Sequence, residues 1–506
     1  MTLGELVAGA QTLATDARAV IERLGVGGRR VSGVVHDSRA ASSGGVFVAV
    51  KGQKADGTIF VEQAASRGAV AVVAEGPAPA GIAVPWIQTT DARLSLAELS
   101  SIFYGRPSDD LKLVGVTGTN GKTTCTYLIA SIFEAADLNC GRIGTVSFKV
   151  AGEERDASHT TPEASELQRL LREMVDRGDR ACAMEVSSHA LVLQRVAYLK
   201  FRAALFTNLT RDHLDFHGDM QQYFDAKRRL FEMLPAGAPA IINVDDPRGL
   251  ELARTLPYVV TYAIDHDADI RPIDVHASLE GVAFDVETPN GRLAVRSPLV
   301  GRPNVYNILG AVGLADALKV PHAAIEQGLA RLDGVPGRFQ IVSGRADDVR
   351  VVVDYAHTDD ALKNLLETAR PLASGRLITV FGCGGDRDKS KRLLMGAVAA
   401  RLSDLVVVTS DNPRSEDADS IIEDIKRGIV PARDPGAPPR AVTPCVAIAD
   451  RRLAIEHAIK SAKPGDLVLV AGKGHEKFQI IGERTLPFDD VDIARAALQR
   501  RATSRV

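Results

Sequence analysis

The stretch LKLVGVTGTNGKTTC, residues 111–125, joins a short apolar run to a glycine-rich turn and then to the start of a helical pattern. The apolar run at 111–116 predicts a buried strand, and the amphipathic pattern from Lys122 to about Leu138 predicts a helix. Glycines between the two allow a tight turn whose backbone N–H groups point at phosphate oxygens. The stretch therefore predicts a strand, a phosphate-binding loop and a helix in direct succession.

Lys122 and Thr123 end this loop with side chains that suit a bound nucleotide. A lysine here can reach the β- and γ-phosphates, and the threonine hydroxyl can be a ligand of Mg²⁺. The spacing differs from the usual GxxxxGK[ST] pattern, because Val116 stands where that pattern has its first glycine. The alternative is a glycine-rich turn that binds no phosphate. A second glycine-rich segment, at 382–388, does not complete a dinucleotide fingerprint because residue 387 is Arg, so NAD is not expected.

The composition is that of a globular protein with several domains. The chain has 506 residues, and about 100–200 residues per domain is usual, which predicts three domains. A formal charge of −3 gives no reason to expect a nucleic-acid or membrane surface. The five cysteines lie far apart without a CxxC pair, which is typical of reduced thiols in a cytosolic protein. Since the N-terminus lacks a signal peptide's basic region and no apolar run approaches ~18 residues, we expect a soluble cytoplasmic protein.

Short apolar runs alternate with helical patterns along most of the chain. Buried strands are predicted at 111–116, 181–186, 202–208 and 239–244, and again at 349–356, 377–383, 404–410 and 466–472. Continuous apolar strands separated by helices predict parallel sheets covered on both faces. The predicted fold class is α/β, with a central P-loop sheet, a C-terminal Rossmann-like sheet and a smaller N-terminal α/β domain. In such sheets, ligands bind beyond the carboxyl ends of the strands.

Two turn-rich segments, YGRPSDD at 104–110 and DGVPGRFQ at 333–340, are interpreted as domain boundaries. They divide the chain into predicted domains at 1–107, 108–336 and 337–506. The proline-rich segment at 432–444 is interpreted as a surface loop of the third domain.

A set of motifs carries a resemblance to a known family over nearly the full chain. The motifs are GVTGTNGKTT (115–124), HDSR (36–39), HTTPE (159–163), MEVSSHAL (184–191), FTNLTRDHLDFHG (206–218), DAKRRLF (225–231), GRPNVYNILGA (301–311), DYAHT (354–358), GCGGDRDKSKR (382–392), DNPR (411–414) and GKGHE (472–476). The chain resembles the Mur ligase family, and within it the synthetases that add the third residue of the peptidoglycan stem peptide. The resemblance implies that ATP activates the carboxylate of a UDP-muramyl dipeptide as an acyl phosphate, which then reacts with meso-diaminopimelate.

The resemblance also implies ATP, two Mg²⁺ ions and a lysine modified by CO₂. The implied ATP-binding residues are Gly118, Thr119, Asn120, Gly121, Lys122, Thr123, Thr124, Asn304 and Asn307, with Asn208 near the triphosphate. The implied metal ligands are Thr123, Glu185, His213 and Lys227 as a carbamate. The implied catalytic residues are Lys122, Lys227, Glu185 and His213. Glu185 follows an apolar strand, where a carboxylate could hold Mg²⁺ beside Thr123, and the alternative is a strand-end glutamate facing solvent. Without the resemblance, Lys227 is typical of a solvated helix face and His213 of a structural histidine, which is also how we interpret His217.

The UDP-muramyl dipeptide is expected to lie across the first and second domains. The resemblance assigns it Ser38, Thr160, Thr161, Ser187 and Arg195. The alternative for TTPE at 160–163 is a helix N-cap followed by proline. Some relatives have Gln where this chain has Leu193, so that contact is absent or replaced. His357 and Arg338 lie in motifs at the start of the third domain, without an assigned role.

The DNPR motif at 411–414 is expected to bind the incoming amino acid. Pro413 fixes its own φ and favours an extended conformation at Asn412. The turn therefore loses little conformational entropy when it orients Arg414 toward a ligand. The guanidinium of Arg414 suits a carboxylate, and Asp411 suits an ammonium group. In the family that this chain resembles, DNPR is the signature for meso-diaminopimelate. The full expected set is Arg387, Asp411, Asn412, Pro413, Arg414, Gly472 and Glu476, and the alternative is an ordinary Asn-Pro turn.

Two other functions stay open from the sequence. A folylpolyglutamate synthetase shares the ATP loop, although HDSR and DNPR argue against it. A nucleotide-sensing P-loop protein would change conformation on its partners instead of joining substrates. We expect a monomer.

Overall fold

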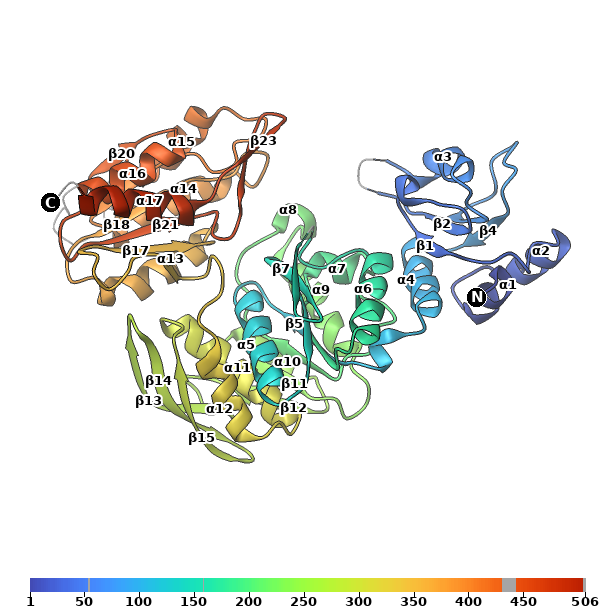
Figure 1. Ribbon diagram of the computed structural model, residues 1–506, viewed down its shortest axis with the longest axis horizontal. Helices are drawn as coiled ribbons and strands as arrows, with labels where there is room; N and C mark the ends of the chain where they lie inside the picture. The colour runs from blue at the N-terminus through green and yellow to red at the C-terminus, as the bar shows by residue number, and fades with distance from the viewer. Residues whose placement is uncertain (53–54, 158, 430–442, 504–506) are drawn as a thin grey trace.

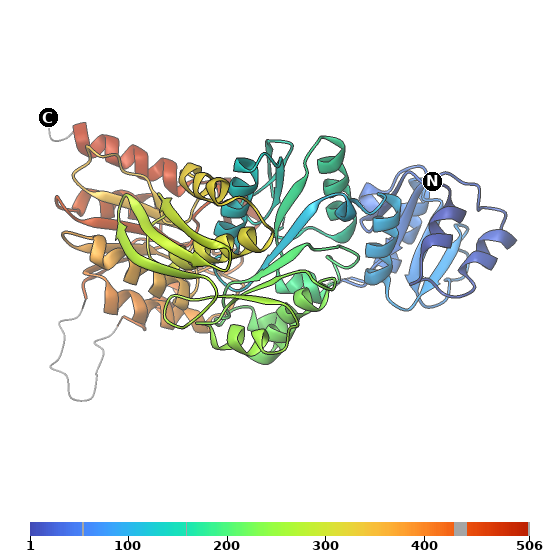
Figure 2. The ribbon, with the colours of Figure 1, turned by 90° about the horizontal axis from the view of Figure 1, so that it is seen from below.

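The computed structural model describes residues 1–52, 55–157, 159–429 and 443–503. It is a three-domain α/β fold with the N-terminal sheet at one end of the long axis and the C-terminal sheet at the other (Figure 1, Figure 2). The fold class predicted from the sequence is confirmed. Most of the segment 432–444, interpreted above as a surface loop, lies outside the described residues. Within the described part of the chain, no helix is both long and apolar enough to cross a membrane.

The N-terminal sheet is parallel, in the order β1-β2-β3-β4, with helices on both faces. Apolar residues of α1, α2 and α4 form one core with it, and those of α3 form a second core on the other face. The strands are β1 (Gly33–Val35), β2 (Gly45–Ala49), β3 (Ala71–Glu75) and β4 (Trp86–Thr89), and the helices are α1 (Leu3–Gly9), α2 (Ala17–Arg23), α3 (Val61–Ser66) and α4 (Ala92–Phe103).

The central sheet has the order β12-β11-β10-β5-β9-β6-β7-β8 and is parallel from β12 to β6. Its α5, α11 and α12 contribute to the core on one face, and α6 and α9 to the core on the other. The strands are β5 (Lys112–Thr117), β6 (Cys140–Ile143), β7 (Ser147–Val150), β8 (Glu153–Asp156), β9 (Ala181–Glu185), β10 (Ala203–Phe206), β11 (Ala240–Asn243) and β12 (Val259–Tyr262). The helices are α5 (Lys122–Ala135), α6 (Ala164–Asp176), α7 (Ser188–Val192), α8 (Leu214–His217), α9 (Met220–Glu232), α10 (Pro247–Ala253), α11 (Arg302–Ala317) and α12 (His322–Arg331).

The C-terminal sheet has the order β16-β17-β21-β18-β19-β20, and only β16 runs antiparallel among its described strands. Cores on its two faces contain α13, α14 and α15 on one side and α16 and α17 on the other. The strands are β16 (Gln340–Ile341), β17 (Arg350–Asp354), β18 (Leu377–Phe381), β19 (Leu405–Val408), β20 (Cys445–Ala447) and β21 (Leu467–Ala471). The helices are α13 (Asp359–Ala369), α14 (Ser390–Leu402), α15 (Ala418–Lys426), α16 (Arg451–Ser461) and α17 (Asp490–Thr503).

Antiparallel strands were not predicted from the sequence. A separate three-stranded sheet contains β13 (Arg271–Ser278), β14 (Gly281–Thr288) and β15 (Gly291–Ser297), and its last two strands are joined by a two-residue turn. A hairpin of β22 (Phe478–Ile481) and β23 (Arg484–Pro487) follows β21. In the central sheet, β7 likewise pairs antiparallel with β6, and β8 pairs antiparallel with β7. The helix expected from Lys122 to about Leu138 ends at Ala135.

Candidate functional site

The phosphate loop lies between β5 and α5, at the carboxyl edge of the central sheet. Gly121 caps α5 with φ +88°, and a Cβ atom there would lie 2.3 Å from Asn307 Oδ1. A Cβ atom on Gly118 would lie 1.9 Å from Thr207 Oγ1. Both positions therefore require glycine, because the backbone turns and the neighbouring chain approaches closely. The packing also places Asn307, one of the expected ATP-binding residues, against the loop.

Two lysines contact the same loop. Lys122 Nζ donates hydrogen bonds to Gly118 O (2.9 Å) and Thr119 O (2.8 Å), and Lys227 Nζ donates to Gly118 O (2.8 Å). Lys227 is 1% exposed, and its ammonium nitrogen lies 4.3 Å from the centre of the Tyr223 ring. Burial lowers the pKa of Lys227 well below its ordinary value, and the neighbouring Lys122 lowers it further. The alternative that Lys227 lies on a solvated helix face is wrong.

Glu185 lies beside the loop because β9 pairs with β5. The register places Glu185 opposite Val116, one residue before the end of β5. Its side chain accepts hydrogen bonds from Thr145 N (2.8 Å) and Thr145 Oγ1 (3.0 Å), and the residue is 1% exposed. The alternative that Glu185 faces solvent is therefore wrong. Near it, the buried Thr123 hydroxyl accepts a hydrogen bond from Arg338 (3.1 Å).

His213 precedes α8 in a left-handed backbone conformation, with φ +55°. The His213 side chain is 44% exposed at the cavity, yet desolvation by the protein around it lowers its pKa to about 4, against the opposing effect of the Asp212 carboxylate, whose Oδ2 lies 3.4 Å from His213 Nε2. The imidazole is thus neutral at pH 7, the form that binds metals. His217 lies within 2.9 Å of Ser188 Oγ and is buried, which suits the structural role expected for it.

The proposed metal ligands suit a hard cation only in part as they stand. Among the residues that the structure describes, no group of three or more His, Cys, Asp and Glu side chains could hold a metal ion. The buried Glu185 carboxylate and the Thr123 hydroxyl supply oxygens of the kind that Mg²⁺ prefers. An unmodified Lys227 amine does not, so this residue fits the ligand set only as a carbamate.

The residues expected to bind the dipeptide cluster around Glu185, with one exception. Thr161 Oγ1 donates to Glu185 O (2.8 Å) and accepts from Ser187 N (3.1 Å), and Arg195 donates to Thr161 O (3.0 Å). Thr160 Oγ1 lies 3.0 Å from Thr145 Oγ1, the group that also contacts Glu185. These threonines do not cap α6, whose N-cap is Glu163, so the alternative for TTPE is wrong.

A cavity of about 1640 Å³ is lined by Thr160, Thr161, Ser187, Arg195, Leu193 and residues of the other two domains. Ser38 is not among the described residues that line it. It lies in the N-terminal domain, where its hydroxyl donates to Gln63 Oε1 (2.6 Å).

A second cavity, of about 490 Å³, is bordered by the phosphate loop. It is lined by Asn120, Gly121, Asn208 and Asn307 from the expected set, and Asn208 Oδ1 accepts from Asn120 N (2.9 Å). Asn304 supports Asn307 by accepting a hydrogen bond from its amide (2.9 Å). Sequence reasoning missed Asp245 and Tyr306, which also line this cavity and bond to each other (2.8 Å). The position of Asp245 just after the strand predicted at 239–244 could have identified it.

The DNPR turn follows β19, and it is buried from Asp411 to Pro413 while Arg414 is half-buried. Asn412 Oδ1 accepts from Ile480 N (2.9 Å), and its amide nitrogen donates to Glu476 Oε2 (2.9 Å). Arg414 has φ +54°, a strained conformation for a residue other than glycine, and its guanidinium donates to Gly385 O (2.8 Å). A Cβ atom on Gly472 would lie 2.7 Å from Asp411 Oδ2. An ordinary exposed Asn-Pro turn would show neither the burial nor these contacts.

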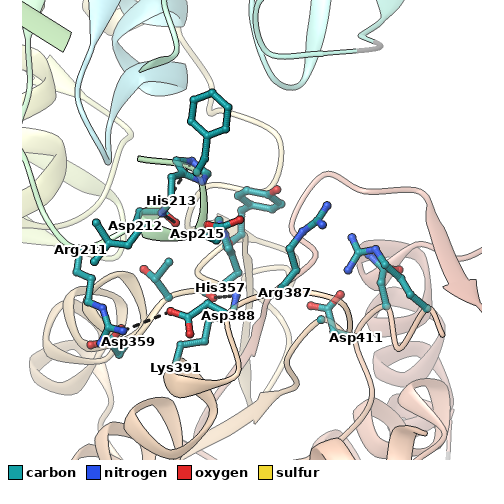
Figure 3. Close-up of a pocket in the computed structure, with 18 of the residues that line it drawn as sticks. Arg211, Asp212, His213, Asp215, His357, Asp359, Arg387, Asp388, Lys391 and Asp411 are labelled. Atoms are coloured by element: carbon teal, nitrogen blue, oxygen red, sulfur yellow. Dashed lines mark hydrogen bonds and ion pairs between the residues drawn. The ribbon is translucent and has the colours of Figure 1, made fainter. Parts of the chain in front are cut away.

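A cavity of about 640 Å³ separates the DNPR turn from the segment 211–216, which contains the proposed metal ligand His213. Asp212 and His213 line it from the central domain, and Arg387 and Asp411 line it from the C-terminal domain (Figure 3). Arg414 also lines it from the C-terminal domain. Arg211 crosses between the domains and donates to Ser390 Oγ (2.7 Å). A ligand held at the DNPR turn would thus project toward the phosphate-loop side of the molecule.

Comparison with known proteins gives consistent matches along the chain. The Mur ligase family catalytic domain matches residues 30–104, the Mur ligase middle domain matches 116–315, and the Mur ligase glutamate ligase domain matches 337–474. A UDP-N-acetylmuramoyl-L-alanyl-D-glutamate--2,6-diaminopimelate ligase of Gloeobacter violaceus is 50% identical over 419 residues, 83% of each chain. The ligase of the same name from Geobacter sulfurreducens is 44% identical over 503 residues, 96% of this chain and 98% of its own. A solved structure of a ligase of this name, 33% identical, superposes with a TM-score of 0.67 and covers 99% of both chains.

Proposed function

This chain belongs to the Mur ligase family, and we propose that it is the ATP-dependent ligase that adds 2,6-diaminopimelate to UDP-N-acetylmuramoyl-L-alanyl-D-glutamate in peptidoglycan precursor synthesis. The observation that carries the proposal is the cavity in which His213 of the central domain faces Arg387, Asp411 and Arg414 of the C-terminal domain. This cavity is where an acceptor amine would meet a carboxyl group activated beside the phosphate loop.

The chemistry explains the cations around the loop. A carboxylate is a poor acyl donor, and transfer of the γ-phosphoryl group of ATP converts it to an acyl phosphate with phosphate as leaving group. The acceptor amine then attacks the carbonyl carbon, and phosphate departs. Because two anions must approach each other in the first step, Lys122 would stabilise the charge on the transferring group. We expect Lys122 to exchange its bonds to Gly118 O and Thr119 O for phosphate oxygens.

The family's use of ATP with Mg²⁺ fits these residues. We further propose the number of ions and a modification of Lys227. Thr123, Glu185, His213 and Lys227 would hold two Mg²⁺ ions, which neutralise phosphate charge when bound. Lys227 would do so as a carbamate, formed when its neutral amine attacks CO₂ and loses a proton. Burial supports this modification because it favours the neutral amine.

The other substrates fit the remaining candidates. Arg414 and Arg387 would bind carboxylates of meso-diaminopimelate, and Asp411 and Glu476 an ammonium group, with Asn412, Pro413 and Gly472 shaping the site. The UDP-muramyl dipeptide would contact Thr160, Thr161, Ser187 and Arg195, with Ser38 at its uridine end. Domains at 1–107, 108–336 and 337–506 would bind UDP-muramyl dipeptide, ATP and amino acid, respectively. A monomer in the cytoplasm completes the proposal.

Phosphate release with the UDP-muramyl dipeptide, ATP and a panel of acceptor amino acids tests this function. We expect rapid release with meso-diaminopimelate and very slow release with L-lysine, L-glutamate or no acceptor. Turnover of a folate substrate with L-glutamate would instead favour the folylpolyglutamate synthetase alternative. A slow rate of ATP hydrolysis that is the same with every acceptor amino acid would favour the nucleotide-sensing alternative.

A further inference from the structure

We call the cavity of about 640 Å³ between His213 and the DNPR turn the acceptor cavity. Lys473 lies next to it and is fully buried, with 0% exposure, and the sequence motifs assign it no role. It follows β21, between Gly472 and Gly474. Its ammonium donates hydrogen bonds to Asn412 Oδ1 (3.0 Å) and Glu476 Oε2 (2.9 Å) and lies 3.8 Å from Asp411 Oδ1. One buried ammonium therefore contacts three of the side chains proposed to recognise the incoming amino acid.

These contacts fix the orientation of Asn412 and Glu476. Asn412 Oδ1 accepts from Lys473 and from Ile480 N, so the amide cannot flip without losing both bonds. Its nitrogen then donates to Glu476 Oε2, which also accepts from Lys473. Within the described residues no hydrogen bond reaches Glu476 Oε1. Since Glu476 lines the acceptor cavity, that oxygen is available to a ligand.

The charges lead to the same conclusion. Asp411 and Glu476 both line the cavity, and two carboxylates near one buried position would repel each other without a cation. Lys473 compensates one of the two charges and leaves a net charge of about −1 on the trio. That balance suits one ligand ammonium. Removal of one partner from such a buried pair leaves an uncompensated charge, which is strongly unfavourable.

We propose that Lys473 is a positioning residue for acceptor recognition: it holds Glu476 and Asp411 ready to bind an ammonium group of the incoming amino acid. The proposal rests on the proposed function for the assignment of this cavity to the acceptor. Lys473 itself does not touch the substrate, because its side chain is fully enclosed. Its effect should therefore appear in acceptor affinity and not in activation of the carboxylate.

The test is steady-state kinetics of Lys473→Met, Glu476→Gln and the double variant, with whichever acceptor the wild-type protein uses best. We expect Lys473→Met to raise the KM for the acceptor on the order of 100-fold. Formation of the acyl phosphate without acceptor, trapped with hydroxylamine, should stay within about twofold of wild type. The double variant should be no worse than Lys473→Met, because Lys473 acts through Glu476.

Two further variants guard against an effect of misfolding. Lys473→Gln removes the charge but keeps a hydrogen-bond donor, and Lys473→Arg keeps the charge. We expect Gln to behave like Met, and Arg to recover much of the acceptor affinity. Arg501→Met is the matched control, since Arg501 is a largely buried cation paired with Asp348 (2.9 Å) elsewhere in the C-terminal domain. It should lower the melting temperature without changing the KM for the acceptor.

The outcomes separate the two proposals. An unchanged acceptor KM in a folded Lys473→Met or Lys473→Gln variant would overturn the role of Lys473, as would effects of Lys473→Met and Glu476→Gln that multiply. A wild-type preference for an acceptor other than diaminopimelate would overturn the proposed function alone. The role of Lys473 would then be decided with that other acceptor.

Discussion

The phosphate loop and the DNPR turn hold their charged side chains in different ways. At the phosphate loop, Lys122 and Lys227 donate to backbone carbonyl oxygens of the loop. At the DNPR turn, Asn412, Lys473 and Glu476 are bonded side chain to side chain. Both sites lie at the carboxyl edge of a parallel sheet, so the difference comes from the partners and not from the fold.

From this difference we infer that the phosphate loop would respond to charge that develops during the reaction, whereas the DNPR turn would select the acceptor amino acid. A lysine bonded to a carbonyl oxygen can exchange that partner for a phosphate oxygen as negative charge develops. A set of side chains bonded to one another has a fixed shape before the ligand arrives, and it rejects a ligand that leaves a polar group unpaired. Variants at the loop should therefore lose turnover with every acceptor, whereas variants at the turn should change the choice of acceptor.

Lys122→Ala should give the largest effect. Removal of a cation that stabilises the transferring phosphoryl group should lower acyl phosphate formation by up to about 10⁵-fold. Binding of the UDP-muramyl dipeptide, measured by calorimetry, should stay nearly unchanged because the residues proposed for that ligand do not include Lys122. Lys112→Ala, at the opposite end of β5, is the control and should be active. If the dipeptide affinity collapses with turnover, the separation of the two sites is wrong.

Arg414→Ala should give the next largest effect, on selection. A site built around a polar group can reject an analogue that lacks it by on the order of 10⁴-fold, so wild type should discriminate strongly against L-lysine, which has no distal carboxylate. The variant should lose diaminopimelate turnover and most of that preference. The measurement is kcat/KM for both acceptors.

Arg414→Lys should recover little, because a point charge cannot replace the fork of the guanidinium. Arg427→Ala removes an exposed arginine of the same domain and should leave both values unchanged. Comparable wild-type values for lysine and diaminopimelate would mean that the DNPR turn does not select the acceptor.

If Lys227 carries the proposed carbamate, Lys227→Ala removes the carbamate oxygens from the phosphate site and should lower turnover about 10³-fold with every acceptor. An added short carboxylic acid should restore part of the activity if it replaces the carbamate oxygens. Arg228→Ala, a neighbouring cation that is exposed and paired with Glu232, should be fully active. Normal turnover of Lys227→Ala would remove this residue from the mechanism.

The strand ends were predictable from the sequence because their signals are local. The buried strands before Gly118, Glu185, Asn208 and Asp411 are short apolar runs, and parallel pairing then gathers their ends at one edge. The β14–β15 hairpin differs from these strands, because its residues alternate between buried and more exposed positions instead of forming a continuous apolar run. The roles of the residues at these edges remain predictions.

The burial of lysines was not predictable from the sequence. Lys227 lies on a polar helix, and two arginines follow it in the sequence. The side chain of Lys227 is buried only because the helix packs against the phosphate loop. Lys473 lies in a glycine-rich turn, where a lysine is normally exposed, and its partners Asn412 and Asp411 come from another strand end. Such burial depends on contacts between segments far apart in the chain, which a local pattern does not contain.

The smallest effect is expected where helix α13 of the C-terminal domain contacts the phosphate loop. Asp360, in the first turn of α13, accepts a hydrogen bond from the phosphate-loop residue Asn120 (3.1 Å) and lines the cavity beside the loop. A single hydrogen bond of this kind contributes about 1 kcal/mol, so Asp360→Ala should raise the KM for ATP only about fivefold. The ratio of kcat/KM for diaminopimelate to that for lysine should not change, because the contacts of Asn412 and Arg414 remain. Asp419→Ala, an exposed acid in the first turn of α15, is the matched control and should leave the KM for ATP unchanged. A change in acceptor preference on loss of the Asp360 side chain would contradict the separate roles of the phosphate loop and the DNPR turn. It would mean that the phosphate loop also takes part in selecting the amino acid.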